Sequence, residues 1–500
     1  MSEISEEASR PESVAGLDRE EQEALDDIWS VWKAKLARNR KRERYYNAKN
    51  RLDNMGISIP PELERFGTVV GWPAKAVDSL ANRSIFEGFG FRTKRNAELD
   101  SVLMDNNFDV LYQQAVESEL INSCSFFTVT RGGPGEPAAI ISCYSASDAA
   151  AVWDTRMKRV RYGFAITETE GGHPTEINLF MPDSVITIRR DGRVWAADKQ
   201  PQKIERPLME PLVYRPSVRR PFGRSRISRP VMELTDAAMR TSLRTEVSAE
   251  VFTLPQRYLL GVDDDFWDPI PEDDGEGGGD AAEPDQDGGG QERMPQATDL
   301  KRAKWDASFA AVFAVGLNSE GDKPTYGQLP QMSMEPHVAH FRQLAAQFAG
   351  ETSVPISSLG VIHDNPASAE AIHAAKEDIV SEATKLNKTN GASLRNLGLM
   401  VLAVIQDRPI RELTEEERSI AVNWMNPATP SIVSQADAMA KLHSIAPWIA
   451  ESDVLLEEMG FNDEQRRRME SDRRNYQGRT LRASLLSDAA SAEGPSGSAG

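Results

Sequence analysis

The chain has 500 residues, of which 40% are hydrophobic, so it can bury a substantial core divided among two to four domains. Its formal net charge is −19, but residues 262–292 contain thirteen Asp or Glu and no Lys or Arg, which leaves only −6 for the rest of the chain. This distribution excludes a strongly basic protein that reads the grooves of a duplex.

Cysteine usage and hydropathy exclude further classes of protein. The two cysteines, Cys124 and Cys143, are too few and too far apart for a disulfide framework or a metal site, which fits a reducing compartment. The longest apolar run, residues 397–405, is far shorter than the roughly 20 residues that span a bilayer. The first fifteen residues are acidic and polar. We therefore expect no membrane-spanning segment and no signal peptide.

The N-terminal region divides into a polar segment and a helix. Residues 1–17 are polar and are predicted to be disordered, whereas from Asp18 onward apolar residues recur on one helical face. The helix ends in a basic patch, residues 38–44, followed by Tyr45 and Tyr46. A basic patch beside aromatic residues is compatible with nucleic-acid binding, but a solvated helix end with the tyrosines in the core is the favoured interpretation.

The next segment, residues 71–90, predicts a helix, a turn and a strand. Trp72 and Pro73 open a helix that contains Asp78, because proline is tolerated in the first turn of a helix. Arg83 follows this helix, and two glycines then introduce the strand. Taken alone, these residues indicate only local structure.

Residues 97–122 predict helices, and the apolar period then changes to short β-type runs separated by Gly and Pro turns. We expect an antiparallel β subdomain packed on these helices, and its residues show no catalytic spacing. The predicted strands lie at 125–129, 139–141, 149–153, 160–166, 177–180, 185–188, 193–195 and 212–214.

A long amphipathic helix is predicted at about 230–252. The acidic segment 262–292 is of low complexity and buries too little apolar surface to offset the entropy of ordering, so we expect it to be disordered. Calcium binding is the alternative, but the regular alternation and the final bidentate Glu of a calcium loop are missing.

Two helices separated by a short loop organise the rest of the chain. The first begins near Ser333 and Pro336 and ends before Pro355. Asn365 caps a second, Ala-rich helix with Pro366 at its first position, where the missing N–H costs nothing. The loop between them contains Ser357, Ser358, Leu359, Gly360, Val361, Ile362 and His363.

This order of features resembles that of the portal proteins of tailed bacteriophages. The resemblance includes the sequence Asn365-Pro366-Ala367-Ser368-Ala369-Glu370-Ala371-Ile372. Within these portal proteins the chain is most similar to the siphophage type, in particular to portals of phages that infect actinobacteria. The segment with Trp72, Pro73, Asp78 and Arg83 is similar to the early signature of that family, and the segment that begins at Trp424 is similar to its C-terminal region. The resemblance covers most of residues 18–475.

The resemblance implies an α+β portal fold with a helical wing and crown, a β-rich wing subdomain, two stem helices and an α/β clip. In such a clip, a strand at 255–261 would enter and strands between 304 and 329 would return to the second stem helix. The implied divisions are a disordered N-terminus at 1–17, a wing at 18–222, a first stem helix at 223–254, a clip at 255–330 with the acidic insertion 262–292, a second stem helix at 331–352, a tunnel loop at 353–364, a wing spine helix at 365–410, crown and C-terminal helices at 411–483, and a disordered tail at 484–500.

The resemblance also implies a function. Such a subunit would join a homo-oligomeric ring, expected to be a dodecamer, at one capsid vertex. Double-stranded DNA would pass through the ring, without sequence specificity, during packaging and ejection. The tunnel loop would face the DNA, with Leu359, Val361 and Ile362 offering apolar contact. The implied partners are the terminase large subunit, head-completion or adaptor proteins, and the major capsid and scaffolding proteins, and the implied location is the virion after assembly in the host cytoplasm.

An enzyme is the less favoured class of protein. The chain contains no phosphate-binding loop, no His-Glu-x-x-His, no Gly-x-Ser-x-Gly and no Cys-x-x-Cys motif. His337 and His340 lie three residues apart on a predicted helix, but the nearest acid, Glu335, points to another face, so we expect no metal site. We predict no catalytic residue and no cofactor, and another virion structural protein, such as a minor head or connector component, is the alternative function.

Overall fold

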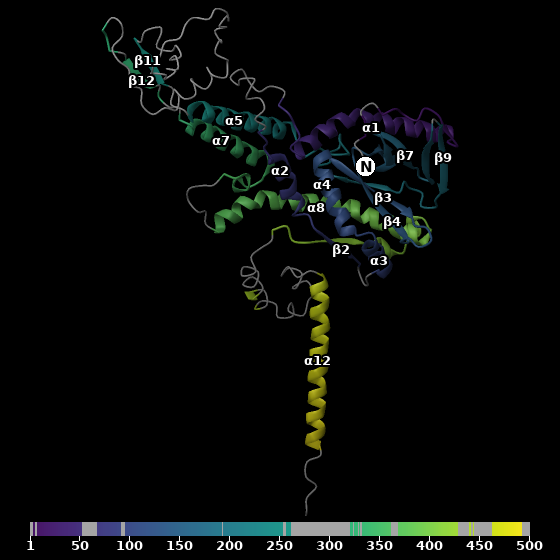
Figure 1. Ribbon diagram of the computed structural model, residues 1–500. Helices are drawn as coiled ribbons and strands as arrows, with labels where there is room; N and C mark the ends of the chain where they lie inside the picture. Colours follow the sequence, from purple (N-terminus) through teal and green to yellow (C-terminus); the bar gives the residue numbers. More distant parts are fainter. Residues whose placement is uncertain are drawn as a thin grey trace, which may run out of the picture. The chain divides into compact units, whose positions relative to one another are not determined.

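The computed structural model (Figure 1) describes residues 4–5, 8–52, 68–91, 96–192, 194–253, 257–261, 321–323, 325–328, 330, 333–361, 369–428, 440–441, 444 and 463–492. The chain divides into two compact units. The first comprises Met1–Leu52, Val69–Ala238 and Leu344–Gly500, and the second comprises Asp53–Thr68 and Met239–Gln343. Helices and strands are mixed along the chain, which confirms the predicted α+β class.

The N-terminal segment belongs to the core, so the prediction that residues 1–17 are disordered is wrong for the described part. Ile4, Ala8 and Val14 are buried in the same apolar cluster as the first helix. The strand β1 (Val14–Ala15) pairs in parallel with β9 (Val194–Pro201). These buried residues are widely spaced and their partners lie far along the chain, so no local periodicity reveals them.

The helix α1 (Arg19–Tyr46) lies against the larger sheet (Figure 1). It begins with a capping box, in which the carboxylates of Asp18 and Glu21 each accept a hydrogen bond from the backbone N–H of the other residue. Trp29 and Trp32 pack on Phe164 of the sheet, with ring centroids 5.9 and 6.1 Å away. These aromatic contacts fix the helix on the sheet.

Two sheets form the predicted β subdomain. The larger has the strand order β1-β9-β8-β7-β6-β5 and the smaller has the order β10-β3-β4. All pairings in them are antiparallel except that of β1 with β9, and each predicted strand overlaps an observed one. The other strands are β3 (Cys124–Arg131), β4 (Ala139–Ser145), β5 (Ala149–Asp154), β6 (Arg159–Glu170), β7 (His173–Phe180), β8 (Ser184–Asp191) and β10 (Met209–Val213).

Three helices lie between α1 and β3 in the chain and confirm the predicted helices. They are α2 (Trp72–Ala81), α3 (Ala97–Asp105) and α4 (Phe108–Asn122). The helix α4 packs on β3 and β4, while α2 packs on α4. The smaller sheet is therefore covered by α4 on one face, as the sequence predicts for an α+β subdomain.

The segment after residue 411 begins as part of this core. The strand β13 (Ala421–Trp424) pairs antiparallel with β2 (Phe86–Gly90). Phe86 contacts the rings of Phe108, Tyr112 and Trp424, with centroids 5.2 to 6.3 Å apart. The prediction that 411–483 consists of crown and C-terminal helices is thus wrong for residues 421–424, because an aromatic cluster holds them against a distant strand.

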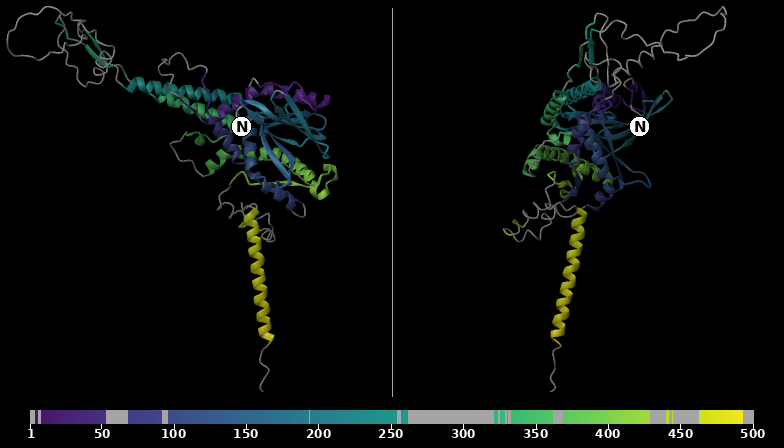
Figure 2. Two further views of the ribbon diagram at one scale, coloured as in Figure 1. Left: turned by 45° about the vertical axis from the view of Figure 1, so that its right-hand side comes forward. Right: turned by 60° about the vertical axis from the view of Figure 1, so that its left-hand side comes forward.

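Long helices dominate the remainder of the described chain. They are α5 (Arg229–Thr253), α7 (Glu335–Thr352) and α8 (Ala369–Gln406), and they confirm the three long helices predicted between 223 and 410. Figures 1 and 2 both show α5 and α7 lying side by side. In the second unit, β11 (Arg257–Leu260) pairs antiparallel with β12 (Thr325–Gln328), as predicted for the strands that flank the acidic segment. The acidic segment 262–292 lies outside the described residues.

The C-terminal region contains short elements followed by one long helix. The short elements are η4 (Ile410–Glu412) and α9 (Glu415–Arg418), and the long helix is α12 (Asp463–Ala492). The prediction of a disordered tail from residue 484 is therefore wrong up to Ala492. Of the predicted crown and C-terminal helices at 411–483, residues 429–462 fall almost entirely outside the described residues.

Candidate functional site

The predicted tunnel loop begins where α7 ends. Ser353 has a positive φ of +55° and terminates α7 in the left-handed conformation, which non-glycine residues adopt at a cost. A short 3-10 helix, η3 (Ile356–Leu359), follows and ends at Gly360, which also has a positive φ of +83°. Five predicted site or signature residues lie outside the described residues, namely Ile362, His363, Asn365, Pro366 and Ser368. Glu370 lies in the first turn described for α8.

The described part of this loop presents polar rather than apolar atoms. Ser357, Ser358 and Gly360 are exposed, whereas Leu359 and Val361 are only 8% and 7% exposed. The turn η3 packs on α2, which accounts for the burial on this side. The expectation that Leu359 and Val361 offer an apolar surface is therefore wrong in this conformation, because both side chains serve to fix the loop on the protein body.

A buried arginine holds the start of the loop. The side chain of Arg226 is 2% exposed, and its guanidinium donates to the carbonyl oxygen of Ala76 in α2 (2.7 Å) and to the carbonyl oxygen of Thr352 at the end of α7 (2.5 Å). It also donates to the Tyr214 hydroxyl (2.9 Å) and forms an ion pair with Glu382 of α8 (2.7 Å). One planar, five-donor group thus joins α2, α7, α8 and the segment after β10.

Glu382 completes this junction from α8. Its carboxylate accepts hydrogen bonds from the Tyr214 hydroxyl and from Arg215, the latter at 2.5 Å. Burial alone would raise the pKa of Glu382, but Arg226, Tyr214 and Arg215 outweigh this effect and hold the pKa below its ordinary value. The carboxylate therefore stays ionised, and the Arg226–Glu382 junction, named here for its buried pair, is an intact charge pair.

Sequence reasoning missed the Arg226–Glu382 junction, although one signal for it exists. Glu382 lies three residues after Ile379 and four before Leu386, both of which are buried on the apolar face of α8. A lone acid on such a face requires a buried partner. Nothing in the local pattern around Arg226 indicates that it supplies the partner.

The signature residues act structurally. The ring of Trp72 contacts Phe348 of α7 at a centroid distance of 5.2 Å, and Pro73 occupies the first turn of α2. The Tyr46 hydroxyl donates to Asp78 (3.0 Å), and Arg83 donates to the carbonyl oxygen of Pro427 (2.6 Å).

Both tyrosines that follow the basic patch have partners within the protein, since the hydroxyl of Tyr45 donates to Asp236 of α5 (2.7 Å). This pairing agrees with the favoured interpretation of the tyrosines as structural.

A second buried polar network links α4 to α8. The Ser84 hydroxyl lies 2.7 Å from the Tyr112 hydroxyl and donates to the side-chain amide oxygen (Oδ1) of Asn387. Nearby, the amide of Asn390 donates to one oxygen of Glu119 (2.8 Å), while the other oxygen of Glu119 has no partner among the described residues. Glu119 is fully buried, and this burial raises its pKa to about 8. It is therefore largely protonated at neutral pH.

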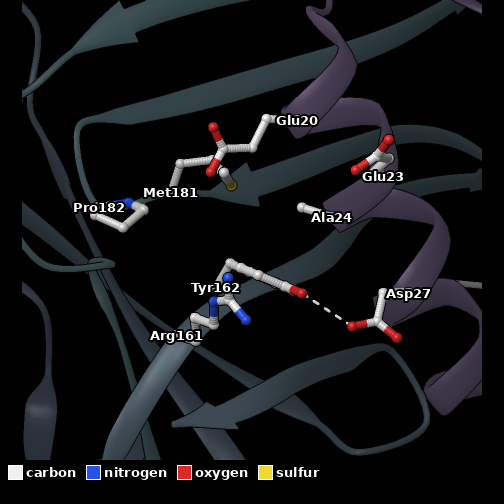
Figure 3. Close-up of a pocket in the computed structure, with 8 residues that line it drawn as sticks. All are labelled: Glu20, Glu23, Ala24, Asp27, Arg161, Tyr162, Met181 and Pro182. Atoms are coloured by element: carbon white, nitrogen blue, oxygen red, sulfur yellow. Dashed lines mark hydrogen bonds between the residues drawn. The ribbon is translucent and has the colours of Figure 1, made fainter. Parts of the chain in front are cut away.

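A small cavity of about 340 Å³ lies between α1 and β6 (Figure 3). Glu20, Glu23 and Asp27 line it from α1, and the Tyr162 hydroxyl of β6 donates to Asp27 (2.9 Å). Burial, and then this hydrogen bond, raise the pKa of Tyr162. The Arg161 guanidinium lies 5.3 Å from the centre of the Tyr162 ring. The contacts tie α1 to the sheet, and they assemble no nucleophile with a base.

Three further observations concern metal ligands, thiols and apolar helices among the described residues. Within them, no group of three or more His, Cys, Asp or Glu is placed to hold a metal ion. Both cysteines are free thiols, and burial raises the pKa of each to about 12. None of the described helices combines the length and the apolar character needed to cross a bilayer.

Comparison with known proteins identifies relatives along nearly the whole chain. Residues 25–479 match the family described as phage portal protein, SPP1 Gp6-like. The portal protein of Mycobacterium phage L5 is 25% identical over 440 residues, which cover 85% of this chain and 82% of that protein. The portal protein of Mycobacterium phage D29 is 24% identical over 462 residues, which cover 89% and 87%.

Solved structures give a weaker similarity. A chain from the virion of a native gene transfer agent particle aligns with a TM-score of 0.41 and 12% identity, covering 82% of this chain and 89% of that one. A chain from the neck of the empty particle aligns with a TM-score of 0.40 and 12% identity, covering 77% and 89%. The family match extends over most of the sequence, and the chain therefore belongs to the SPP1 Gp6-like family of phage portal proteins, components of the capsid vertex.

Proposed function

We propose that this chain is one subunit of a closed ring, expected to contain twelve copies, through which double-stranded DNA is packaged and ejected. The ring would be assembled in the host cytoplasm, without catalytic activity or a cofactor of its own. Membership of the portal family supports this function, and the head-to-tail contacts of such a ring must close by rotation. The observation that carries the proposal is the Arg226–Glu382 junction, because it anchors two long helices and the start of the loop at one point.

In this proposal, α5 and α7 are the two stem helices and the paired strands β11 and β12 belong to the clip. The clip, residues 255–330, would dock the terminase large subunit during packaging and the head-completion or adaptor proteins afterwards. Major capsid and scaffolding proteins would contact the ring from outside. The near-neutral charge outside 262–292 supports a channel that does not trap DNA by phosphate contacts.

The loop 353–364 would face the DNA through its exposed polar surface. Ser357, Ser358 and Gly360 offer hydroxyl and backbone groups but no cation, so contact with a passing duplex would be weak and independent of sequence. The burial of Leu359 and Val361 would keep the loop at a constant position while DNA moves.

Two experiments test the proposed function. Electron microscopy of the purified protein should show rings with a central hole, and monomers or closed globules would contradict the ring. In particles stalled during packaging, Ser358→Cys carrying a photo-crosslinker should attach to DNA. Met157→Cys, at a position on the β5–β6 turn that is 54% exposed, is the matched control and should not. Equal crosslinking at both positions would contradict the loop assignment.

A further inference from the structure

A second cavity, of about 660 Å³, lies in the first unit between the C-terminal half of α1 and the segment that connects β10 to α5. Eight of the side chains that line it are Lys or Arg, and one, Glu351, is an acid. In a chain with a net charge of −19, this concentration of positive charge is unusual. The size of this basic cleft falls within the range of ligand sites in proteins, roughly 300–1,000 Å³.

Most of the positive charge in the basic cleft has no counter-charge. Arg215 pairs with Glu382, and Arg229 lies 3.9 Å from Glu233. Among the described residues, no ion pair involves the other six cations. These are Lys35, Arg38, Arg42, Arg219, Arg220 and Arg224.

The surroundings of Arg42 in the cleft disfavour the positive charge of its guanidinium. It is half-buried, and its guanidinium donates to the carbonyl oxygen of Asn122 (3.2 Å) rather than to a carboxylate. Burial, followed by repulsion from Arg38, lowers the pKa of Arg42 to about 10. A bound anion would offset both effects, because it supplies the missing opposite charge.

The cations stand on two walls. Lys35, Arg38 and Arg42 follow one another on α1 at spacings of three and four residues and so share a face. At 1.5 Å per residue they form a row about 10 Å long, which is about three steps of 3.4 Å between phosphates of one DNA strand, measured along the helix axis. Arg219 and Arg220 form part of the opposite wall, where both are exposed.

The contacts available in the cleft suit phosphates rather than bases. Arginine predominates over lysine, and its planar fork matches phosphate oxygens. The ring of Phe222, which also lines the cleft, contacts Phe126 and Trp153 at centroid distances of 6.0 and 5.8 Å. It is therefore engaged within the protein, and no open stacking platform for bases results.

We propose that the basic cleft binds the phosphate backbone of double-stranded DNA outside the central channel, without sequence specificity. The choice of DNA among polyanions rests on the proposed function, since DNA is the polyanion that a portal handles. The cleft would hold a duplex through its arginines, in contrast to the loop, whose described residues from Ser353 to Val361 carry no cation.

The test is binding of a fluorescent duplex of arbitrary sequence to the full-length protein, measured by anisotropy between about 50 and 200 mM salt. We expect Arg219→Gln combined with Arg220→Gln to weaken binding about tenfold at the lower salt. The slope of log affinity against log salt should become less steep by about 2, because each lost phosphate contact removes about 0.9. Arg38→Gln, on the other wall, should reduce the slope by about 1.

The matched control changes the same charge elsewhere in the same unit. Arg156→Gln combined with Arg161→Gln removes two exposed arginines on and beside the β5–β6 turn and should leave both affinity and slope unchanged. The seven arginines of α12 are unchanged in the wild type and in every variant. Any DNA binding by them is therefore the same in all these proteins and does not affect the differences between them. Thermal unfolding of each variant checks that it is folded.

Three results would overturn the proposal. Equal weakening by the cleft and control pairs would mean that only net charge matters, and no change in the cleft pair would mean that DNA does not use the cleft. Tighter competition by polyglutamate than by DNA would assign the cleft to an acidic protein segment. If rings form normally but the cleft variants bind DNA like the wild type, the proposed DNA site in the cleft is wrong and the proposed ring stands. If the cleft binds DNA but the protein forms no ring, the proposed ring is wrong and the DNA site in the cleft stands.

Discussion

The protonation of Glu119 makes the stability of this subunit depend on pH in a way that one substitution should remove. In the native state the carboxyl group stays protonated up to a pKa of about 8, whereas in the unfolded chain it ionises near 4.5. Between these values the unfolded state binds fewer protons than the native state. The free energy of unfolding therefore falls as pH rises, by about 1.4 kcal/mol per pH unit.

Replacement of Glu119 by Gln keeps the shape of the protonated side chain and removes the ionisation. The amide oxygen of the glutamine can still accept the hydrogen bond from Asn390, which Glu119 accepts at 2.8 Å. We expect little difference between variant and wild type near pH 4.5. The variant should then become more stable by about 3 kcal/mol at pH 7, with no further gain above pH 8.

Chemical unfolding of both proteins at intervals from pH 5 to pH 9 measures this difference, because pH effects shared by the two proteins cancel. Glu98→Gln, at an exposed position of α3, reports the effect of the same substitution without burial. A Glu119→Gln advantage that stays constant over this range would refute the reasoning, because it would show that Glu119 has the same charge in both states.

Two further predictions concern the Arg226–Glu382 junction and backbone packing. Arg226→Met should lower the free energy of unfolding by about 3–5 kcal/mol, since it leaves Glu382 buried without its main counter-charge, and hydrogen exchange should rise first at the amides that follow Thr352. If exchange there stays as slow as in the wild type, Arg226 does not anchor the loop. Gly163→Ala should destabilise by about 1–3 kcal/mol, because the added Cβ would lie 2.4 Å from the Met209 sulfur and 3.0 Å from the Ala150 carbonyl oxygen. Gly350→Ala in α7, where a Cβ meets nothing within 4 Å, should instead stabilise by about 0.5–1 kcal/mol, and thermal unfolding that ranks the two alanines equally would contradict the packing argument.

Elements whose stability is encoded in their own residues could be predicted from the sequence. The helices α5, α7 and α8 carry continuous apolar stripes, and the strands from β3 to β10 alternate or cluster apolar residues between turns. The failures are of another kind. The segment with Ile4 and Val14, and the strand that contains Trp424, are held by partners far along the chain, and local patterns do not record such partners.

The loop shows the same limit at the level of single side chains. Leu359 and Val361 are apolar residues in a predicted lumen-facing loop, and composition alone suggests that they contact a ligand. Their burial depends on where η3 packs against α2, and this depends on a junction formed by residues from four separate segments. Periodicity therefore located the loop but could not say which of its atoms face outward.

The Arg226–Glu382 junction is better explained by geometry than by stability. A buried ion pair is often no more stable than well-packed apolar residues of similar volume, so charge attraction alone does not account for Arg226. An apolar side chain at this position would leave the carbonyl oxygen of Thr352, at the end of α7, without the donor that it now has, at a cost of about 1–3 kcal/mol. The carbonyl oxygen of Ala76 would lose the donor that it has besides the N–H of its own helix. Only a rigid fork with several donors satisfies both carbonyls, the Tyr214 hydroxyl and Glu382 from one position. The end of α7 and the side of α8 are thus set relative to the same planar group. In the proposed function the loop would keep a constant position while DNA moves past, and the Arg226 guanidinium would set that position for both helices.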